Sequence, residues 1–333
     1  MLSDMHSLAR PTRLRRLDPR PALRRALALN RPLTLVGLTM LVALAGTLIG
    51  LLADQRVITG APAWLKPAKF AISISIYSFT FLWLLSFVQG HARLVRLITN
   101  VTALAFIVEM ILIVTQVVRG TTSHFNLATP LDATIFSTMG LFIVVAWVMS
   151  LLAAVLLLRQ PLPDRAYAWA LGLGLLLSLV GAAVGILMTI PTGAQLAAAV
   201  AGRGLPISGA HSVGVHDGGS GLPLVGWSTT GGDLRVAHFV GLHALQMLPL
   251  AGWLLSRSRA RRLGAHHRLA LVWTAGLSYL GLIALLTWQA LRSQPLIAPD
   301  AATLAALGAL LGGAALATLA ILAHARRAAA STP

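Results

Sequence analysis

The chain has 333 residues, of which 57% are hydrophobic and only 11% are charged, and its formal net charge is +17. This composition is too apolar for a soluble domain, and long apolar runs recur along the chain, which indicates a membrane protein. The absence of cysteine excludes disulfides, thiolate metal sites and thiol catalysis.

Eight apolar runs are long enough to cross about 30 Å of hydrocarbon as helices. Continuous runs of this length are typical of helices rather than of barrel strands. We therefore predict an all-α, polytopic membrane protein. Its eight membrane helices cover residues 32–53, 64–88, 96–118, 131–158, 167–190, 234–255, 269–291 and 301–323.

The basic residues predict the orientation of these helices. With the N-terminus in the cytoplasm, 19 of the 26 lysines and arginines fall on the inner side, and every inner loop is richer in them than the outer loop it follows. This positive-inside pattern places both termini in the cytoplasm and the longest loop, 191–233, outside. We expect a multi-pass protein of a bacterial inner membrane.

The same pattern divides the chain into segments. Residues 1–31 form a basic cytoplasmic segment, 32–158 a first four-helix half, 167–323 a second half, and 324–333 a cytoplasmic tail. We expect the arginines of the N-terminal segment to contact anionic lipid headgroups rather than nucleic acid.

The second and third predicted helices carry the rarest charges of the chain. Lys66 and Lys69 are its two lysines, and they begin the second helix from the outer side; Glu109 is its one glutamate and lies at mid-membrane depth in the third. A carboxylate within hydrocarbon is costly unless it faces a partner or a wet cavity, which makes Glu109 a candidate functional residue. The outer loop that follows holds Arg119 and His124. Asp132 follows Thr129 by three residues, which indicates a structural helix cap.

The second half offers histidines instead. The glycine-rich loop 191–233 holds His211, His216 and Asp217, and the sixth predicted helix holds Arg235, His238 and His243. At 100° per residue His238 and His243 lie roughly 140° apart around their helix. Glycines spaced four apart, at 181 and 185 and at 308 and 312, predict close helix packing.

Three matches suggest an internal repeat. LKPAKF at 65–70 resembles LRVAHF at 234–239, the helix end QVVR at 116–119 resembles QALR at 289–292, and a Pro-Asp helix start recurs at 130–132 and 299–300. The offsets are 169, 173 and 169 residues. We therefore predict two parallel four-helix repeats related by a pseudo-two-fold axis along the membrane normal.

The candidate ligand-binding residues are expected to converge on one outward-facing cavity between the second, third and sixth helices. They are Lys66, Lys69, Glu109, Arg119, His124, Arg235, His238 and His243. The candidate metal ligands are His238, His243 and His216, since imidazole suits zinc, copper or iron.

Three functional hypotheses follow from these residues. In the first, the cavity binds or transports a small anionic or amphiphilic ligand from the outer side, and Glu109 carries a proton. In the second, the protein is a membrane oxidoreductase with haem or a transition metal as cofactor. In the third, it is a structural or sensory membrane subunit whose polar groups only join helices.

Overall fold

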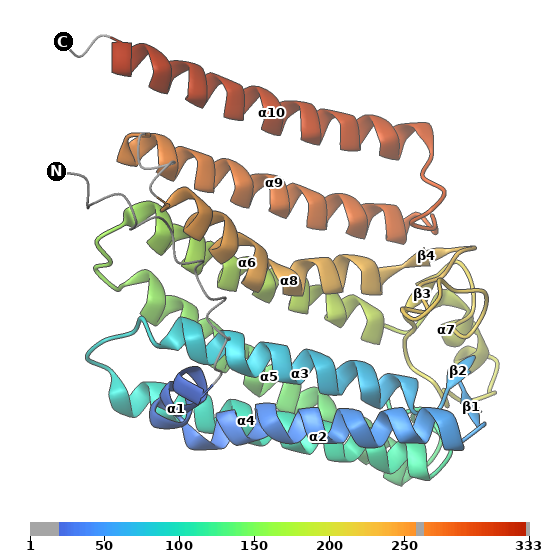
Figure 1. Ribbon diagram of the computed structural model, residues 1–333. Coiled ribbons are helices and arrows are strands. Elements are labelled where there is room, and N and C mark those ends of the chain that lie inside the picture. The colour runs from blue at the N-terminus through green and yellow to red at the C-terminus, as the bar shows by residue number, and fades with distance from the viewer. Residues whose placement is uncertain (1–19, 258–262, 331–333) are drawn as a thin grey trace, which may run out of the picture.

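In the computed structural model, which describes residues 20–257 and 263–330, eight long helices form an all-α bundle (Figure 1). The helices are α2 (Arg31–Ala53), α3 (Leu65–Leu85), α4 (Ala92–Val118), α5 (Pro130–Leu158), α6 (Arg165–Thr189), α8 (Leu234–Leu255), α9 (Ala265–Leu291) and α10 (Ala301–Ala330). Each is long and apolar enough to cross a membrane. The predicted class and the eight predicted spans are thus confirmed.

The remaining elements are short. They are α1 (Arg20–Leu29), α7 (Gly193–Val200), the antiparallel pair β1 (Val57–Ile58) with β2 (Ala61–Pro62), and the antiparallel pair β3 (Ser212–Val213) with β4 (Gly232–Asp233). The four strands and α7 lie together at one end of the bundle, which we call the loop end (Figure 1). The opposite end, with α1, the end of α10 and the connections 86–91 and 159–164, is the terminal end.

Two features differ from the predicted segments. Residues 20–29 of the basic N-terminal segment form α1, and α10 continues through most of the predicted tail as far as Ala330. The arginines at 10, 13, 15 and 16 lie outside the described residues.

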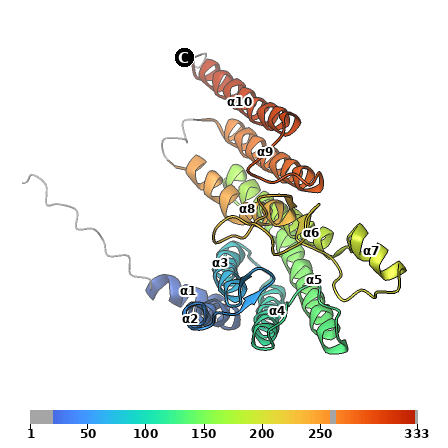
Figure 2. The same ribbon diagram turned by 90° about the vertical axis from the view of Figure 1, so that its right-hand side faces the viewer.

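The long helices fall into two groups with the same pattern of neighbours (Figure 2). In the first group α2 packs against α3, α4 packs against both, and α5 packs against α4. In the second group α6 packs against α8, α9 packs against both, and α10 packs against α9. Contacts between α5 and α6 join the groups, and α10 lies at the edge of the bundle.

Small residues decide how closely α6 and α8 approach. Gly181 on α6 lies against Gly241 on α8, and a Cβ atom on either would collide with the backbone of the other. The predicted close packing at Gly181 is therefore observed. For Gly308 and Gly312 the prediction was wrong, because apart from the neighbouring part of α10 itself no heavy atom of the described chain lies within 4 Å of where their Cβ atoms would be. That face of α10 is open.

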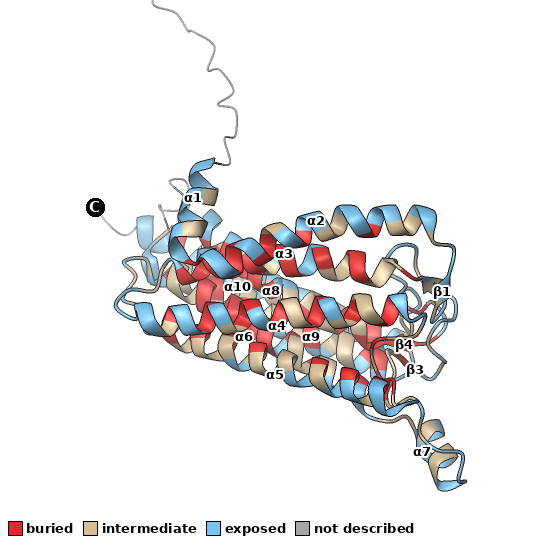
Figure 3. Cartoon of the chain, turned by 90° about the horizontal axis from the view of Figure 1, so that it is seen from below, coloured by how far each residue is buried: buried red, intermediate tan, exposed pale blue. Residues whose placement is uncertain are grey.

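Buried side chains run along the inside of the bundle and leave the outer faces of the helices exposed (Figure 3). Two apolar clusters make up most of this core, one centred on α2–α5 and the other on α6, α8 and α9. The exposed leucines, isoleucines and valines of the outer faces suit contact with lipid. The protein is a multi-pass membrane protein.

Candidate functional site

Lys66 and Lys69 are held at the loop end by the first turns of α3. Pro67 is in the first turn, where a missing backbone N–H costs nothing. The Lys66 Nζ donates to His124 Nδ1 at 2.9 Å, and the Lys69 Nζ donates to the carbonyl oxygen of Val225 at 3.2 Å. Neither lysine pairs with a carboxylate in the described part of the chain. Both ammonium groups thus have neutral acceptors, beside a helix N-terminus that adds positive potential.

Glu109 lies on α4 and is buried, with 1% of its side chain exposed. Its Oε1 is 3.8 Å from His124 Nε2, and neither carboxylate oxygen has a hydrogen-bond partner among the described residues. His124 therefore stands between Lys66 and Glu109. Because its Nδ1 accepts from Lys66, the proton of a neutral ring is on Nε2, which faces the carboxylate. A shift of under 1 Å would close this contact to a hydrogen bond.

His124 is neutral in this setting. It lies in the loop after α4, packed against the rings of Phe70, Phe125 and Phe136. Burial lowers the pKa of His124 well below its ordinary value, and the positive charge of Lys66 lowers it further. Charges on His211 and His238 would act in the same direction, so both of these residues lie within electrostatic range of His124.

His211 and Asp217 form a second pair in the loop between α6 and α8. Asp217 accepts from the backbone N–H groups of His211 and Ser212 and contacts His211 Nδ1 at 2.8 Å. Burial opposes ionisation of Asp217, but these hydrogen bonds outweigh it and hold the pKa of the carboxyl below its ordinary value. Burial lowers the pKa of His211, although the neighbouring Asp217 opposes that shift.

Arg235 begins α8 and is clamped to Asp233, the residue that caps this helix. The Arg235 Nε donates to Asp233 Oδ1 at 2.9 Å, and the guanidinium reaches Oδ2 at 2.6 Å. The same guanidinium also donates to the carbonyl oxygen of Gly226 at 2.6 Å. Arg235 thus binds the residue next to the one that Lys69 binds.

The segment 222–227, which we call the cap segment, is consequently held by two cations from different helix groups. It is a tight turn: the N–H of Leu222 donates to Trp227 and that of Gly226 donates to Leu222, each at 2.8 Å. Leu224 and Gly226 have positive φ angles of 65° and 68°, and Leu224 is 82% exposed. A left-handed leucine costs of order 1 kcal/mol, so this conformation depends on the contacts that hold it.

His238 on α8 lies beside the close α6–α8 contact at Gly181. Its Nδ1 is 2.8 Å from the carbonyl oxygen of Gly181, to which it donates, so its Nε2 carries a free lone pair. The ring lies next to Gly185, where a Cβ atom would be 3.4 Å from it, an ordinary contact distance. Six of the eight expected site residues therefore gather at the loop end around the N-termini of α3 and α8: Lys66, Lys69, Glu109, His124, Arg235 and His238.

Arg119 and His243, the other two expected site residues, lie outside this group. Arg119 pairs with Asp132 at 2.6 Å and with Gln116, in a network that joins α4 to α5 and includes the cap residue Thr129. The predicted structural role of Asp132 agrees with this network. His243 is exposed, and among the described residues its side chain hydrogen-bonds to Gln246 at 3.3 Å; its position on α8 turns it away from His238.

The expected metal ligands are not brought together. His216 is exposed in the loop, His243 points away, and His238 is held on Gly181. Five residues along a helix is a poor spacing for two ligands of one ion, since it turns the second side chain to another face. His211, Asp217 and the carbonyl groups of the cap segment belong to the site but were not among the expected residues.

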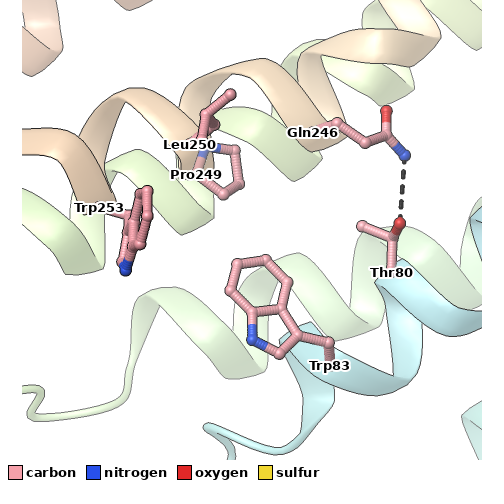
Figure 4. A pocket seen from close by; sticks show the side chains of 6 residues that line it. All are labelled: Thr80, Trp83, Gln246, Pro249, Leu250 and Trp253. Carbon is pink, nitrogen blue, oxygen red and sulfur yellow. Dashed lines mark hydrogen bonds between the residues drawn. The ribbon is translucent and has the colours of Figure 1, made fainter. Parts of the chain in front are cut away.

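A separate groove lies between α3 and α8, nearer the terminal end than the residues described above (Figure 4). Its volume is about 390 Å³, and it is lined by Thr80, Trp83, Gln246, Pro249, Leu250 and Trp253. The Gln246 amide donates to Thr80 at 3.3 Å at one end, and the two indole rings form an apolar floor and wall. The guanidinium of Arg257 lies 3.7 Å from the centre of the Trp253 ring.

No protein-family model, curated protein or solved structure matches this chain.

Proposed function

We propose that the protein binds an anionic amphiphile at the loop end, and that this end faces outward from a bacterial inner membrane with both termini in the cytoplasm. The observation that carries the proposal is the pairing of Lys69 and Arg235 with backbone carbonyl oxygens of the cap segment. A carbonyl dipole is a weaker partner for an ammonium or guanidinium group than an anion is. An anionic head group would therefore displace the cap segment from Lys69, which has no carboxylate partner among the described residues, and would lie beside Arg235, which Asp233 already binds.

The groove favours an amphiphile over a small anion. Lys69 and Thr80 are eleven residues apart on α3, and Arg235 and Gln246 are eleven apart on α8. This spacing corresponds to about 16 Å along each helix. A ligand whose head group lies between the cations would place a single acyl-like chain between α3 and α8 and into the groove. The exposed side chains Ile72 and Ile76 of α3 lie on the intervening turns.

The Glu109–His124–Lys66 chain supports a proton-carrying role within the same site. A neutral imidazole that accepts on one nitrogen and donates on the other can pass a proton between Lys66 and the buried carboxylate. Binding of an anion beside Lys66 and its release would then be coupled to protonation of Glu109.

The test compares ligands that differ only in the head group. Purified protein in detergent is heated with myristate, with myristyl alcohol or with inorganic phosphate, at equal ionic strength. We expect myristate to raise the melting temperature by several degrees and the other two to raise it little, since a ligand at 100 times its Kd stabilises by about 2.7 kcal/mol. Lys69→Gln should abolish the difference between acid and alcohol.

Arg292→Gln is the matched control, because Arg292 is also a loop-end cation but is paired with Asp300. It should leave the myristate effect unchanged. Equal stabilisation by the acid and the alcohol, or an undiminished response in Lys69→Gln, would contradict the proposal.

One observation favours a haem- or metal-dependent oxidoreductase as the second candidate. The Nδ1 of His238 is fixed on a carbonyl oxygen and its Nε2 has no hydrogen-bond partner among the described residues, which is how a histidine ligand is usually oriented. The absorption spectrum of protein purified from cells supplied with haem tests this function. Haem bands that are lost in His238→Ala would favour it over ligand transport.

A further inference from the structure

Three histidines meet at the terminal end, far from the loop-end site. His266 and His267 lie in the first turn of α9, and His324 lies near the end of α10. The His267 Nε2 is 2.8 Å from His324 Nδ1 and 3.2 Å from His266 Nε2. One nitrogen of each ring lies within 4.8 Å of the other two, and no other such group of three potential metal ligands occurs in the described chain.

Hydrogen bonding alone explains this arrangement poorly. A ring nitrogen of neutral histidine either donates one proton or accepts at one lone pair. The Nε2 of His267 has close nitrogen neighbours on two sides, so at most one of the two contacts can be a good hydrogen bond. A cation placed among the three nitrogens could accept a lone pair from each of them.

The distances fit a small transition-metal ion. Ligand nitrogens at 2.0–2.1 Å from a tetrahedral zinc ion are about 3.3 Å from one another. The observed separations of 2.8 and 3.2 Å are close to this value. Imidazole is a preferred ligand of Zn²⁺, Cu²⁺ and Ni²⁺. His267 is 5% exposed, whereas His266 and His324 are exposed. One ligand would therefore be buried against the helices, and the other two would face water.

The position of the three histidines gives a bound ion a structural role, which is to join α10 to α9. α10 lies at the edge of the bundle, and its buried residues are Thr303 and Ala325, one near each end. At the loop end, Thr303 is held by Gln294 and Arg292 in a hydrogen-bond network that includes Asp300. At the terminal end, the corresponding attachment of α10 to α9 is the contact of His324 with His267.

We propose that His266, His267 and His324 bind one transition-metal ion, of which Zn²⁺ is the representative, and that this ion fastens the end of α10 to the start of α9. Water completes the coordination at the fourth position. The nearby Arg268 is paired with Asp164 at 2.5 Å, and the two exposed histidines let water screen the ion from the arginines of this end.

The experiment uses the full chain in detergent, purified without a polyhistidine tag, loaded with ZnCl₂ and dialysed against metal-free buffer. Elemental analysis should find about one zinc per chain. His324→Ala and His267→Ala should each weaken zinc binding at least about tenfold, a loss that even supporting residues of metal sites produce. His91→Ala is the control, because His91 is an exposed histidine at the same end. Absence of retained zinc, or unchanged retention in both variants, would overturn the proposal.

A second measurement needs no variant and covers the case in which a substitution impairs folding. Diethylpyrocarbonate modifies exposed histidines, and mass spectrometry locates the products. Zinc should protect His266 and His324 of the wild-type protein and leave the modification of His91 unchanged. Equal modification of His324 with and without zinc would also overturn the proposal.

Discussion

At the scale of single residues, Glu109 differs from the other acidic residues of the described chain. Each of the aspartates accepts hydrogen bonds from a backbone N–H, an arginine or another polar side chain, whereas the oxygens of Glu109 accept none. A carboxylate that contributes no hydrogen bond to the fold is explained more readily by function than by stability.

Glu109→Gln should therefore change the melting temperature little, by less than about 1 kcal/mol in stability, because the amide keeps the shape and removes a buried charge. Asp132→Asn is the comparison: it weakens contacts to Arg119, Gln116 and Thr129 and should cost about 1–3 kcal/mol. The same Glu109→Gln protein should lose the pH dependence of myristate binding. An equal loss of stability in the two variants would mean that Glu109 is structural.

The histidines of the loop end predict how stability depends on pH. The pKa values of His124 and His211 are lowered in the folded protein from an ordinary value of 6.5. The unfolded chain therefore binds more protons than the folded chain below about pH 6.5, and stability falls with falling pH. At pH 5 each residue can contribute a loss of up to about 2 kcal/mol.

Thermal unfolding between pH 7.5 and pH 5 checks this expectation. The melting temperature should fall on acidification, and His124→Gln should make the fall shallower because glutamine does not titrate. His243→Gln, at an exposed position, should leave the profile unchanged. A His124→Gln profile that follows the wild-type profile would contradict burial of a neutral His124.

The sequence indicates several polar residues that lie at the loop end, but not the groups that they contact. Lys66, Lys69, Arg235 and His238 were predictable because rare polar residues near helix ends stand out against apolar runs. Their partners Val225, Gly226 and Gly181 contribute carbonyl oxygens, which every residue has, so no side chain marks them. His324 was assigned to a tail, and its contact with His267 requires the fold to bring together residues 57 positions apart.

At the scale of elements, the internal repeat stays a prediction, and the two helix groups share two features with it. Arg119 at the end of α4 pairs with Asp132 at the start of α5, and Arg292 at the end of α9 pairs with Asp300 just before α10. These residues belong to the matches found in the sequence. The order of neighbours in α2–α5 and in α6, α8, α9 and α10 is also the same. The groups differ at the loop end, where α6 and α8 are joined by a much longer connection.

Substitution of two glycines tests how closely these helices pack. Gly241→Ala should destabilise the protein by about 1–3 kcal/mol, because the added methyl group collides with the backbone at Gly181. Gly308→Ala, in an open part of α10, should be neutral or stabilise by up to about 1 kcal/mol through higher helix propensity. Thermal unfolding of both variants in the same detergent provides the comparison. Similar effects of the two substitutions would contradict the close α6–α8 contact.

At the scale of the whole molecule, the eight spans were predictable because each hydrophobic run meets the length that the bilayer imposes. The proposed orientation can be tested directly, since the chain has no cysteine to interfere. In intact cells Gly219→Cys should react with a membrane-impermeant maleimide, and His91→Cys should react only after the cells are opened. Labelling of His91→Cys alone in intact cells would reverse the orientation and place the cap segment in the cytoplasm.

The most direct test of an anionic amphiphile site is to locate a bound ligand. A fatty acid with a photoactivatable diazirine near its methyl end is bound to the purified protein, irradiated and mapped by peptide mass spectrometry. We expect adducts at the groove residues of α3 and α8, which are Thr80, Trp83, Gln246, Pro249, Leu250 and Trp253. A Lys69→Gln, Arg235→Gln double variant should lose them. Adducts spread over the exposed faces of α2 and α10, and unaffected by the double substitution, would contradict it.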